Sequence, residues 1–450
     1  MRAAKGKKRF LSWKWMLPAT IAILVLGCWA KNITTPYYTQ TTSYYCGAAS
    51  AQMILNSEKL GIYVPSQATL YNYIHPHNQC SNWYTDPKGL NDVLNNYAGT
   101  KAHFVVSALA NQNDGVKKLA YTIDRYGVPP ASLIYGCMHW VVVRGVITDV
   151  QPTTASSYTI NGFFVNDPWY GATSLGENKY IDIAHWKSDY FTGCGWCGSP
   201  GGDKFISVVD PEPIPKVIVR FPAVMARKAV VIAPRMAKAR AAAVMEQFEK
   251  QKGFHDQFGE ALSVMRTSSI GDPVLVKRSD NVRNAYYIVP FLKGSLASGA
   301  ILLDAYSGQL QEATYVKQPL EYTNKFQVKN ATEIFRQKLP QLEIRPELDK
   351  MLKIAPVRKM LPSAVSKKAA MRLKTFRELN IKPSEVTITN MELVWQPSEE
   401  SQNPYYPLWK VTGSVRSAKN QTIGFMDFKG KVVPDIKGIS RVEMKGGGIR

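Results

Sequence analysis

The segment Gln40-Thr41-Thr42-Ser43-Tyr44-Tyr45-Cys46-Gly47-Ala48-Ala49-Ser50 places an amide side chain six residues before a cysteine that opens a predicted helix. Helix-forming residues continue to Leu55, and Gly61 follows where such a helix should have ended. Cysteine reacts as a thiolate, which the unpaired N–H groups and partial positive charge of a helix N-terminus favour. The segment therefore predicts a thiol nucleophile at Cys46, although a small-residue helix start packed in a core has the same pattern.

A catalytic thiol needs a base and a residue that orients the base. Among six histidines, His139 opens the run His139-Trp140-Val141-Val142-Val143, which predicts a buried strand. The next strand-like run, residues 158–165, is followed by Asn166-Asp167-Pro168, so Asp167 is also expected at a strand end. Two adjacent strands of this kind can put the carboxylate against the far nitrogen of the imidazole. The alternative for Asp167 is an Asp-Pro pair that merely begins a turn.

These residues resemble the papain-like cysteine peptidases, and more closely the bacteriocin-processing peptidases that act on double-glycine leaders, in a stand-alone exported form. The resemblance covers roughly residues 36–210. It implies an α+β papain-like fold, with a helix at the nucleophile and an antiparallel sheet that carries the histidine and the aspartate. It also implies Cys46 as nucleophile, His139 as general base, Asp167 as its orienting partner and Gln40 as an oxyanion-hole donor, with no cofactor and no metal.

The resemblance implies an exported, membrane-proximal cysteine endopeptidase that hydrolyses peptide bonds of a peptide or protein substrate through a Cys46 thioester. The same Cys-His-Asp site would serve an acyl transferase or cross-linking enzyme. A non-catalytic peptide- or wall-binding module is the third hypothesis. Cys137, two residues before the base, is a departure from the family pattern because it places a second thiol near the site.

The N-terminus has the order of an export signal, with a cluster of basic residues followed by an apolar run from Trp15 to Gly27. Leu24-Val25-Leu26-Gly27-Cys28 resembles a bacterial lipobox, in which Cys28 would carry lipid. An uncleaved signal anchor and a cleaved signal are the alternatives. The expected location is the extracellular face of a bacterial membrane, either anchored or lipidated, or a secreted form.

Export to an oxidising compartment permits disulfides among Cys80, Cys137, Cys194 and Cys197, whose three pairings the sequence does not rank. The Cys194-Gly195-Trp196-Cys197 segment lies in a glycine-rich loop without the strand that a redox motif requires, so a local or structural bridge is expected. A further hypothesis is a structural zinc site made of His75, His77, Cys80, Cys194 and Cys197.

Composition changes after residue 210. Residues 1–210 hold 17 Lys and Arg against 12 Asp and Glu, a net charge of +5, and the remainder holds 39 against 22, a net charge of +17. A proline-rich segment, residues 210–215, predicts an extended linker between the two halves. The expected divisions are an export signal or anchor (1–30), the peptidase-like domain (31–210), a linker with a basic helix (211–266), two helix-hairpin modules (267–320 and 321–435) and a flexible basic tail (436–450).

The two modules form an internal repeat in an α+β C-terminal region. Strand-like residues 285–291 and 300–310 are echoed by residues 404–411 and 423–433, and helices are expected over 254–265 and 367–379. The repeat loosely resembles PepSY-type modules, which implies binding, spacing or regulation. The basic excess favours an anionic wall polymer or lipid surface, and nucleic acid is not expected because export separates the chain from it.

Overall fold

The computed structural model describes residues 28–64, 66–169, 175–198, 204–209, 216–281, 283–345, 348, 374–416 and 418–437. The predicted export signal up to residue 27, the linker residues 210–215 and the tail from residue 438 lie outside these ranges. Among the described residues, no helix combines the length and the apolar character that crossing a membrane requires.

The helical layer of the first half is built around the helix that begins at Cys46. Its neighbours α2 and α3 have side-chain N-caps, since Ser66 accepts a hydrogen bond from the Thr69 N–H and Asp86 accepts one from the Gly89 N–H. Their apolar faces share one core with strands β3 (Ala131–Ile134) and β4 (His139–Thr148). The helices of this half are α1 (Cys46–Leu55), α2 (Gln67–His77), α3 (Pro87–Ala98), α4 (Gln112–Tyr126), α5 (Ile183–His185) and the π-helix η2 (Trp186–Tyr190).

The sheet of the first half brings the start of β4 (His139–Thr148) close to the end of β5 (Ser157–Asn166). Strand β4 pairs antiparallel with β5, and Val142 lies opposite Asn166. His139 opens β4 and Asp167 directly follows β5, as the sequence predicts. The strands are β1 (Trp29–Asn32), β2 (Val105–Leu109), β3 (Ala131–Ile134), β4 (His139–Thr148), β5 (Ser157–Asn166), β6 (Lys179–Asp182) and β7 (Phe205–Val209).

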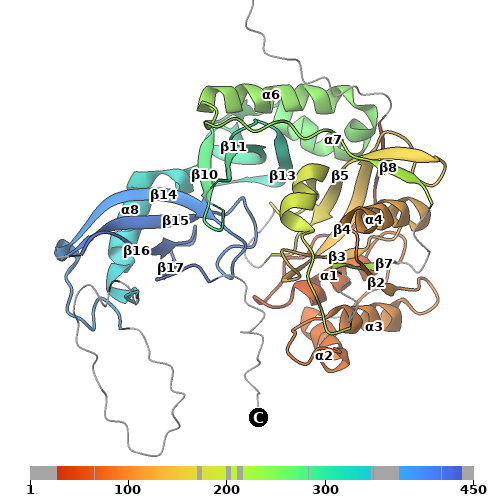
Figure 1. Ribbon diagram of the computed structural model, residues 1–450, viewed down its shortest axis with the longest axis horizontal. Coiled ribbons are helices and arrows are strands. Elements are labelled where there is room, and N and C mark those ends of the chain that lie inside the picture. The colour runs from red at the N-terminus through yellow and green to blue at the C-terminus, as the bar shows by residue number, and fades with distance from the viewer. Residues whose placement is uncertain are drawn as a thin grey trace, which may run out of the picture.

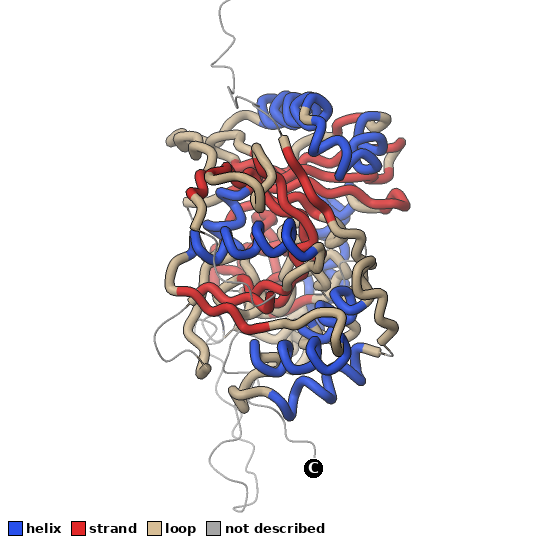
Figure 2. Tube along the Cα trace, turned by 90° about the vertical axis from the view of Figure 1, so that its right-hand side faces the viewer, coloured by secondary structure: helices blue, strands red, loops and turns tan. Residues whose placement is uncertain are grey.

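The second half continues this sheet. Strand β13 pairs antiparallel with β6, and β10 pairs in parallel with β14, so strands of both halves form one connected sheet. Figure 1 shows the two halves side by side, and Figure 2, seen from the right-hand side of Figure 1, shows helices above and below the strands. The strands are β8 (Ile218–Arg220), β9 (Ser269–Ile270), β10 (Val274–Arg278), β11 (Ala285–Lys293), β12 (Leu296–Asp304), β13 (Leu310–Leu320), β14 (Val386–Trp395), β15 (Leu408–Val415), β16 (Ala418–Met426) and β17 (Val432–Val433).

Two helices of the second half, α6 (Pro234–Lys250) and α7 (Lys252–Arg266), cover the junction between the halves, across the top of Figure 1. The rings of Phe248 and Phe254 stack with centroids 3.7 Å apart, and Phe254 also contacts Phe164 of β5 and Tyr180 of β6. Each such aromatic pair contributes about 0.5–1.5 kcal/mol beyond the area it buries. The halves therefore share a core as well as a sheet.

Both predicted hairpins form, as the β11–β12 and β15–β16 pairs. Each is followed by a turn in which an aspartate carboxylate accepts backbone N–H groups, Asp304 in the first copy and Asp427 in the second, and a glycine with positive φ closes the turn. The expected helix over 367–379 is wrong in its described part, because residues 374–379 form a bridge and turns. Helix α8 (Val328–Lys338) packs against β14 instead. The remaining helices are η3 (Thr323–Phe326), η4 (Leu339–Gln341) and η5 (Pro383–Glu385).

Candidate active site

Helix α1 presents Cys46 at its first turn. Tyr45 occupies the N-cap position without a side-chain cap, so the N–H groups at this end are left for other partners. Cys46 is a free, half-buried cysteine. Gly47 lets the helix approach the loop at Thr85, because a Cβ at this position would lie 2.3 Å from Thr85 Cγ2. The close packing fixes the helix end that carries the thiol.

His139 is fully buried and bound on one side. Its Nε2 lies 2.9 Å from Asp167 Oδ1, which leaves Nδ1 for Cys46, whose side chain interacts with this ring. Burial alone would lower the pKa of His139, but hydrogen bonding to Asp167 and Cys46 raises it to about 9. These partners therefore favour the protonated imidazole at neutral pH.

Asp167 is also fully buried and has a partner for each oxygen. Oδ1 accepts from His139 and from the Trp169 N–H, and Oδ2 lies 3.2 Å from Lys179 Nζ. Burial would raise the pKa of Asp167, but Lys179 and His139 together lower it to about 2. The carboxylate stays charged wherever the protein is folded at ordinary pH, and its position holds the imidazole in one orientation.

Gln40 is buried, with 2 % of its surface exposed, and its amide makes no hydrogen bond to the described residues. Its backbone N–H donates to the Pro168 carbonyl oxygen at 2.6 Å, which ties this loop to the residue after Asp167. Tyr37 makes a second tie, since its hydroxyl donates to the Asp167 carbonyl oxygen. The side-chain amide is therefore available to a bound group at this position.

The turn before His139 has an unusual backbone. Tyr135, Gly136 and Cys137 all have φ between 54° and 67°, in the left-handed region that costs a non-glycine residue about 1 kcal/mol or more. The Tyr135 N–H donates to the Tyr190 carbonyl, and Cys137 forms a disulfide with Cys194. These bonds hold the turn, and with it the start of the strand that carries His139.

The disulfides divide the Cys194–Cys197 pair between two partners. Cys137 bonds to Cys194, and Cys80 bonds to Cys197. Of the two expected forms, structural bridges are present and a local Cys194–Cys197 bridge is not, because each cysteine is bonded to a residue distant in sequence. Cys80, Asp86 and Cys197 lie close together, but the two sulfurs are joined to each other and are not thiolates that could hold zinc.

The aromatic residues near the site fall into two groups. Trp140 and Trp169 are core residues, since Trp140 donates to the Thr85 carbonyl oxygen and Trp169 packs on Tyr406 of the second half. Tyr44 and Tyr45 lie half-exposed beside Cys46, and Tyr44 contacts Tyr71 and Tyr84. An aromatic surface therefore adjoins the thiol on the helical side. Tyr170, the aromatic residue that follows Trp169, lies outside the described residues.

Three residues of the site escaped sequence reasoning: Lys179, Tyr190 and Glu312. Lys179 Nζ contacts Asp167, the Tyr190 hydroxyl at 3.1 Å and Glu312 at 3.5 Å. A lysine at a strand start gives no sign of burial in the sequence. Glu312 belongs to β13, in the other half of the chain, so no local pattern relates it to Asp167.

Comparison with protein families gives a match in the first half of the chain. Residues 32–192 match the Peptidase_C39 like family. No curated protein and no solved structure matches the chain. The mixed fold of helices and sheet is compatible with a papain-like peptidase, whereas the PepSY resemblance of the second half has no counterpart in these matches. The match supports a papain-like domain of the C39 peptidase type over residues 32–192, which indicates a cysteine peptidase.

Proposed function

We propose that this protein is an exported, membrane-proximal cysteine endopeptidase with Cys46 as its nucleophile. The observation that carries the proposal is the contact between His139 Nε2 and Asp167 Oδ1, with Cys46 interacting with the same imidazole from the start of α1. In this arrangement each group has one role: the thiol attacks, the imidazole transfers the proton and the carboxylate orients the imidazole.

The proposed reaction uses these groups in sequence. His139 holds the thiol proton while the Cys46 thiolate attacks the carbonyl carbon of the scissile peptide bond. Gln40 Nε2 and the Cys46 N–H donate to the oxyanion, and His139 then gives its proton to the leaving amine as the C–N bond breaks. Water attacks the resulting thioester, His139 takes the water's proton, and the acid product leaves as the thiol is restored.

The test is cleavage of a peptide library by the purified ectodomain, the chain from residue 29 onward, and by its Cys46→Ala variant. The other free cysteine in the described residues, Cys28, lies before this ectodomain, so Cys28→Ala in the full chain is the matched control. We expect cleavage to be abolished by Cys46→Ala and by iodoacetamide, and to survive Cys28→Ala. Full hydrolysis by Cys46→Ala refutes the proposal. Added amines test for acyl transfer, which would give amide products in place of acids.

The export part of the proposal rests on the N-terminal sequence. The basic cluster, the apolar run and Cys28 favour a lipidated or anchored protein whose bulk faces outward. Fatty-acid labelling of cells that express wild type or Cys28→Ala distinguishes the forms. Label on wild type alone identifies a lipoprotein, and membrane retention without label identifies an anchor. Accumulation of protease-protected, unprocessed chain in the cytoplasm contradicts export.

A further inference from the structure

A buried ionic network leads from the candidate active site into the second half of the chain. Its first member is Lys179 at the start of β6, whose side chain is fully buried. The ammonium lies between two carboxylates, with Asp167 Oδ2 at 3.2 Å and Glu312 Oε2 at 3.5 Å, and it also donates to the Tyr190 hydroxyl. A buried ammonium remains charged only when such partners replace its water.

Glu312 is brought to this place by the pairing of β13 with β6. Glu312 lies opposite Ile181 in that register, and its side chain is fully buried. Its other oxygen, Oε1, accepts from the Tyr190 hydroxyl and lies 3.2 Å from His185 Nε2. The two carboxylate oxygens of Glu312 therefore have different partners in the network: Oε2 faces Lys179 and Oε1 faces His185.

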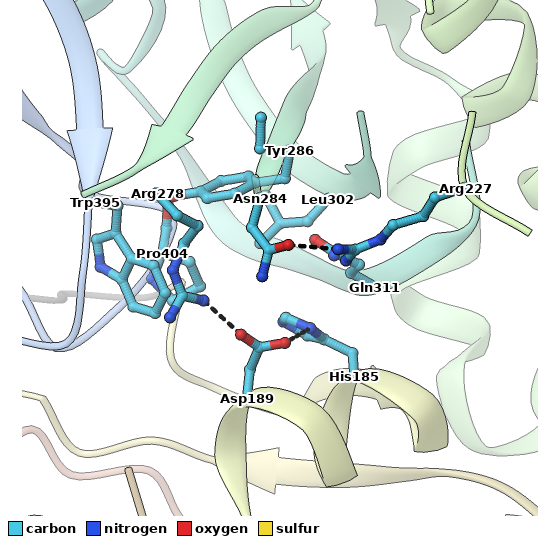
Figure 3. Close-up of a pocket in the computed structure, with 11 residues that line it drawn as sticks. His185, Asp189, Arg227, Arg278, Asn284, Tyr286, Leu302, Gln311, Trp395 and Pro404 are labelled. Carbon is cyan, nitrogen blue, oxygen red and sulfur yellow. Dashed lines mark hydrogen bonds and ion pairs between the residues drawn. The ribbon is translucent and has the colours of Figure 1, made fainter. Parts of the chain in front are cut away.

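Beyond Glu312 the network alternates in charge. His185 Nδ1 lies 3.1 Å from Asp189, and Asp189 lies 2.5 Å from Arg278 of β10, as Figure 3 shows. Arg278 also pairs with Asp280 and stacks over the Trp395 ring. From His139 to Asp280 the successive members of the network alternate between positive and negative, so removal of one member leaves its neighbours unbalanced.

We propose that Lys179 and Glu312 are positioning residues for the Cys46-His139-Asp167 site, and that the second half is thereby part of the catalytic unit. Lys179 holds Oδ2 of Asp167 so that Oδ1 faces His139, and Glu312 holds Lys179. Buried ion pairs of this kind give little net stability compared with apolar packing, so a network of such length at this place is better explained by orientation than by stability. The inference rests on the proposed peptidase function.

The same strand junction supplies a matched control. Lys317 of β13 pairs with Glu177, which precedes β6, at 2.8 Å, with 56 % of the Lys317 and 21 % of the Glu177 side chain exposed, and among the described residues neither side chain has a hydrogen bond or ion pair to Asp167. The variants Lys317→Met and Glu177→Gln therefore remove the same charges across the same junction as Lys179→Met and Glu312→Gln. An exposed pair contributes little to stability.

The experiment compares kcat and KM of these four variants on one peptide substrate, in the full chain. We expect kcat to fall by about 10- to 100-fold in Lys179→Met and Glu312→Gln, the size typical of partners that orient a functional ligand, with little change in KM. Both controls should stay within about twofold of wild type. A wild-type kcat in folded Glu312→Gln overturns the proposal.

The double variant Lys179→Met with Glu312→Gln separates orientation by charge from packing. It removes one positive and one negative charge together, so we expect a smaller loss than the product of the two single losses. A loss equal to that product or greater overturns the proposal, because two packing defects would combine in that way. The outcome is independent of the function test: if Cys46→Ala keeps full activity, the peptidase assignment fails, whereas retained activity in Glu312→Gln alone overturns only the positioning role.

Discussion

Replacing Asp167 by asparagine removes the carboxylate that holds the His139 imidazolium and keeps the side-chain volume. The hydrogen bond of 2.9 Å and the charge of Asp167 raise the pKa of His139 against a burial effect that lowers it. Without the carboxylate, burial should bring the pKa of His139 down from about 9 towards its ordinary 6.5, with Cys46 as the remaining partner that raises it. A change of that size corresponds to a few kcal/mol of interaction with the protonated imidazole.

The expected consequence is largest in mildly alkaline solution. At pH 8 the protonated fraction of His139 falls from about 90 % towards about 3 %, a change of up to about 30-fold, and loss of ring orientation adds to it. The assay is kcat/KM against pH for wild type and Asp167→Asn on one peptide, with Glu177→Gln as the control for loss of a charge. The alkaline limb should move from about pH 9 towards 6.5. An alkaline limb that stays near pH 9 in Asp167→Asn would refute the reasoning.

Three other outcomes follow from the geometry. Gln40→Ala should lower kcat by about 10²–10³ with little change in KM, and a wild-type kcat contradicts an oxyanion role. Cys137→Ser should release the left-handed turn before His139 and lower kcat, whereas Cys80→Ser, in the other disulfide, should lower the melting temperature with less effect on kcat. Burial lowers the pKa of His139 and of His185, but their carboxylate partners raise both to about 9. Their contribution to stability is complete below pH 6.5 and is lost as the pH rises through about 9, so the free energy of unfolding in urea should fall by a few kcal/mol across that window. A constant free energy from pH 6.5 to 9.5 contradicts this.

The second half of the chain packs more extensively against the peptidase-like domain than separate repeat modules would. Strand β13 extends the sheet beyond β6, and Phe248 and Phe254 join a core that includes Phe164. Removal of this half should therefore expose both a strand edge and an apolar surface. The division of the second half into two modules stays a prediction. The β13–β6 pairing and the shared aromatic core connect this half to the candidate site.

The positions of the helix and the two strands that carry the site residues could be predicted from local residue patterns. Helix α1 begins at Cys46, β4 begins at His139 and β5 ends just before Asp167, all where the residue patterns predict, because propensity and periodicity act within a few neighbours. The family resemblance then related Gln40 to the same site, and the match over residues 32–192 supports a C39-type domain there.

The distant groups that complete the site depend on the three-dimensional packing of the chain and not on local sequence. The pairing of β13 with β6 puts Glu312 beside Lys179, the disulfides join Cys80 to Cys197 and Cys137 to Cys194, and α8 occupies the place expected for a later helix. A strand edge accepts many partners with similar backbone hydrogen bonds, so the choice depends on side-chain packing summed over the whole core. Whether a side chain is buried depends on this packing of the whole core. Lys179 pairs with Asp167 because both side chains are buried there.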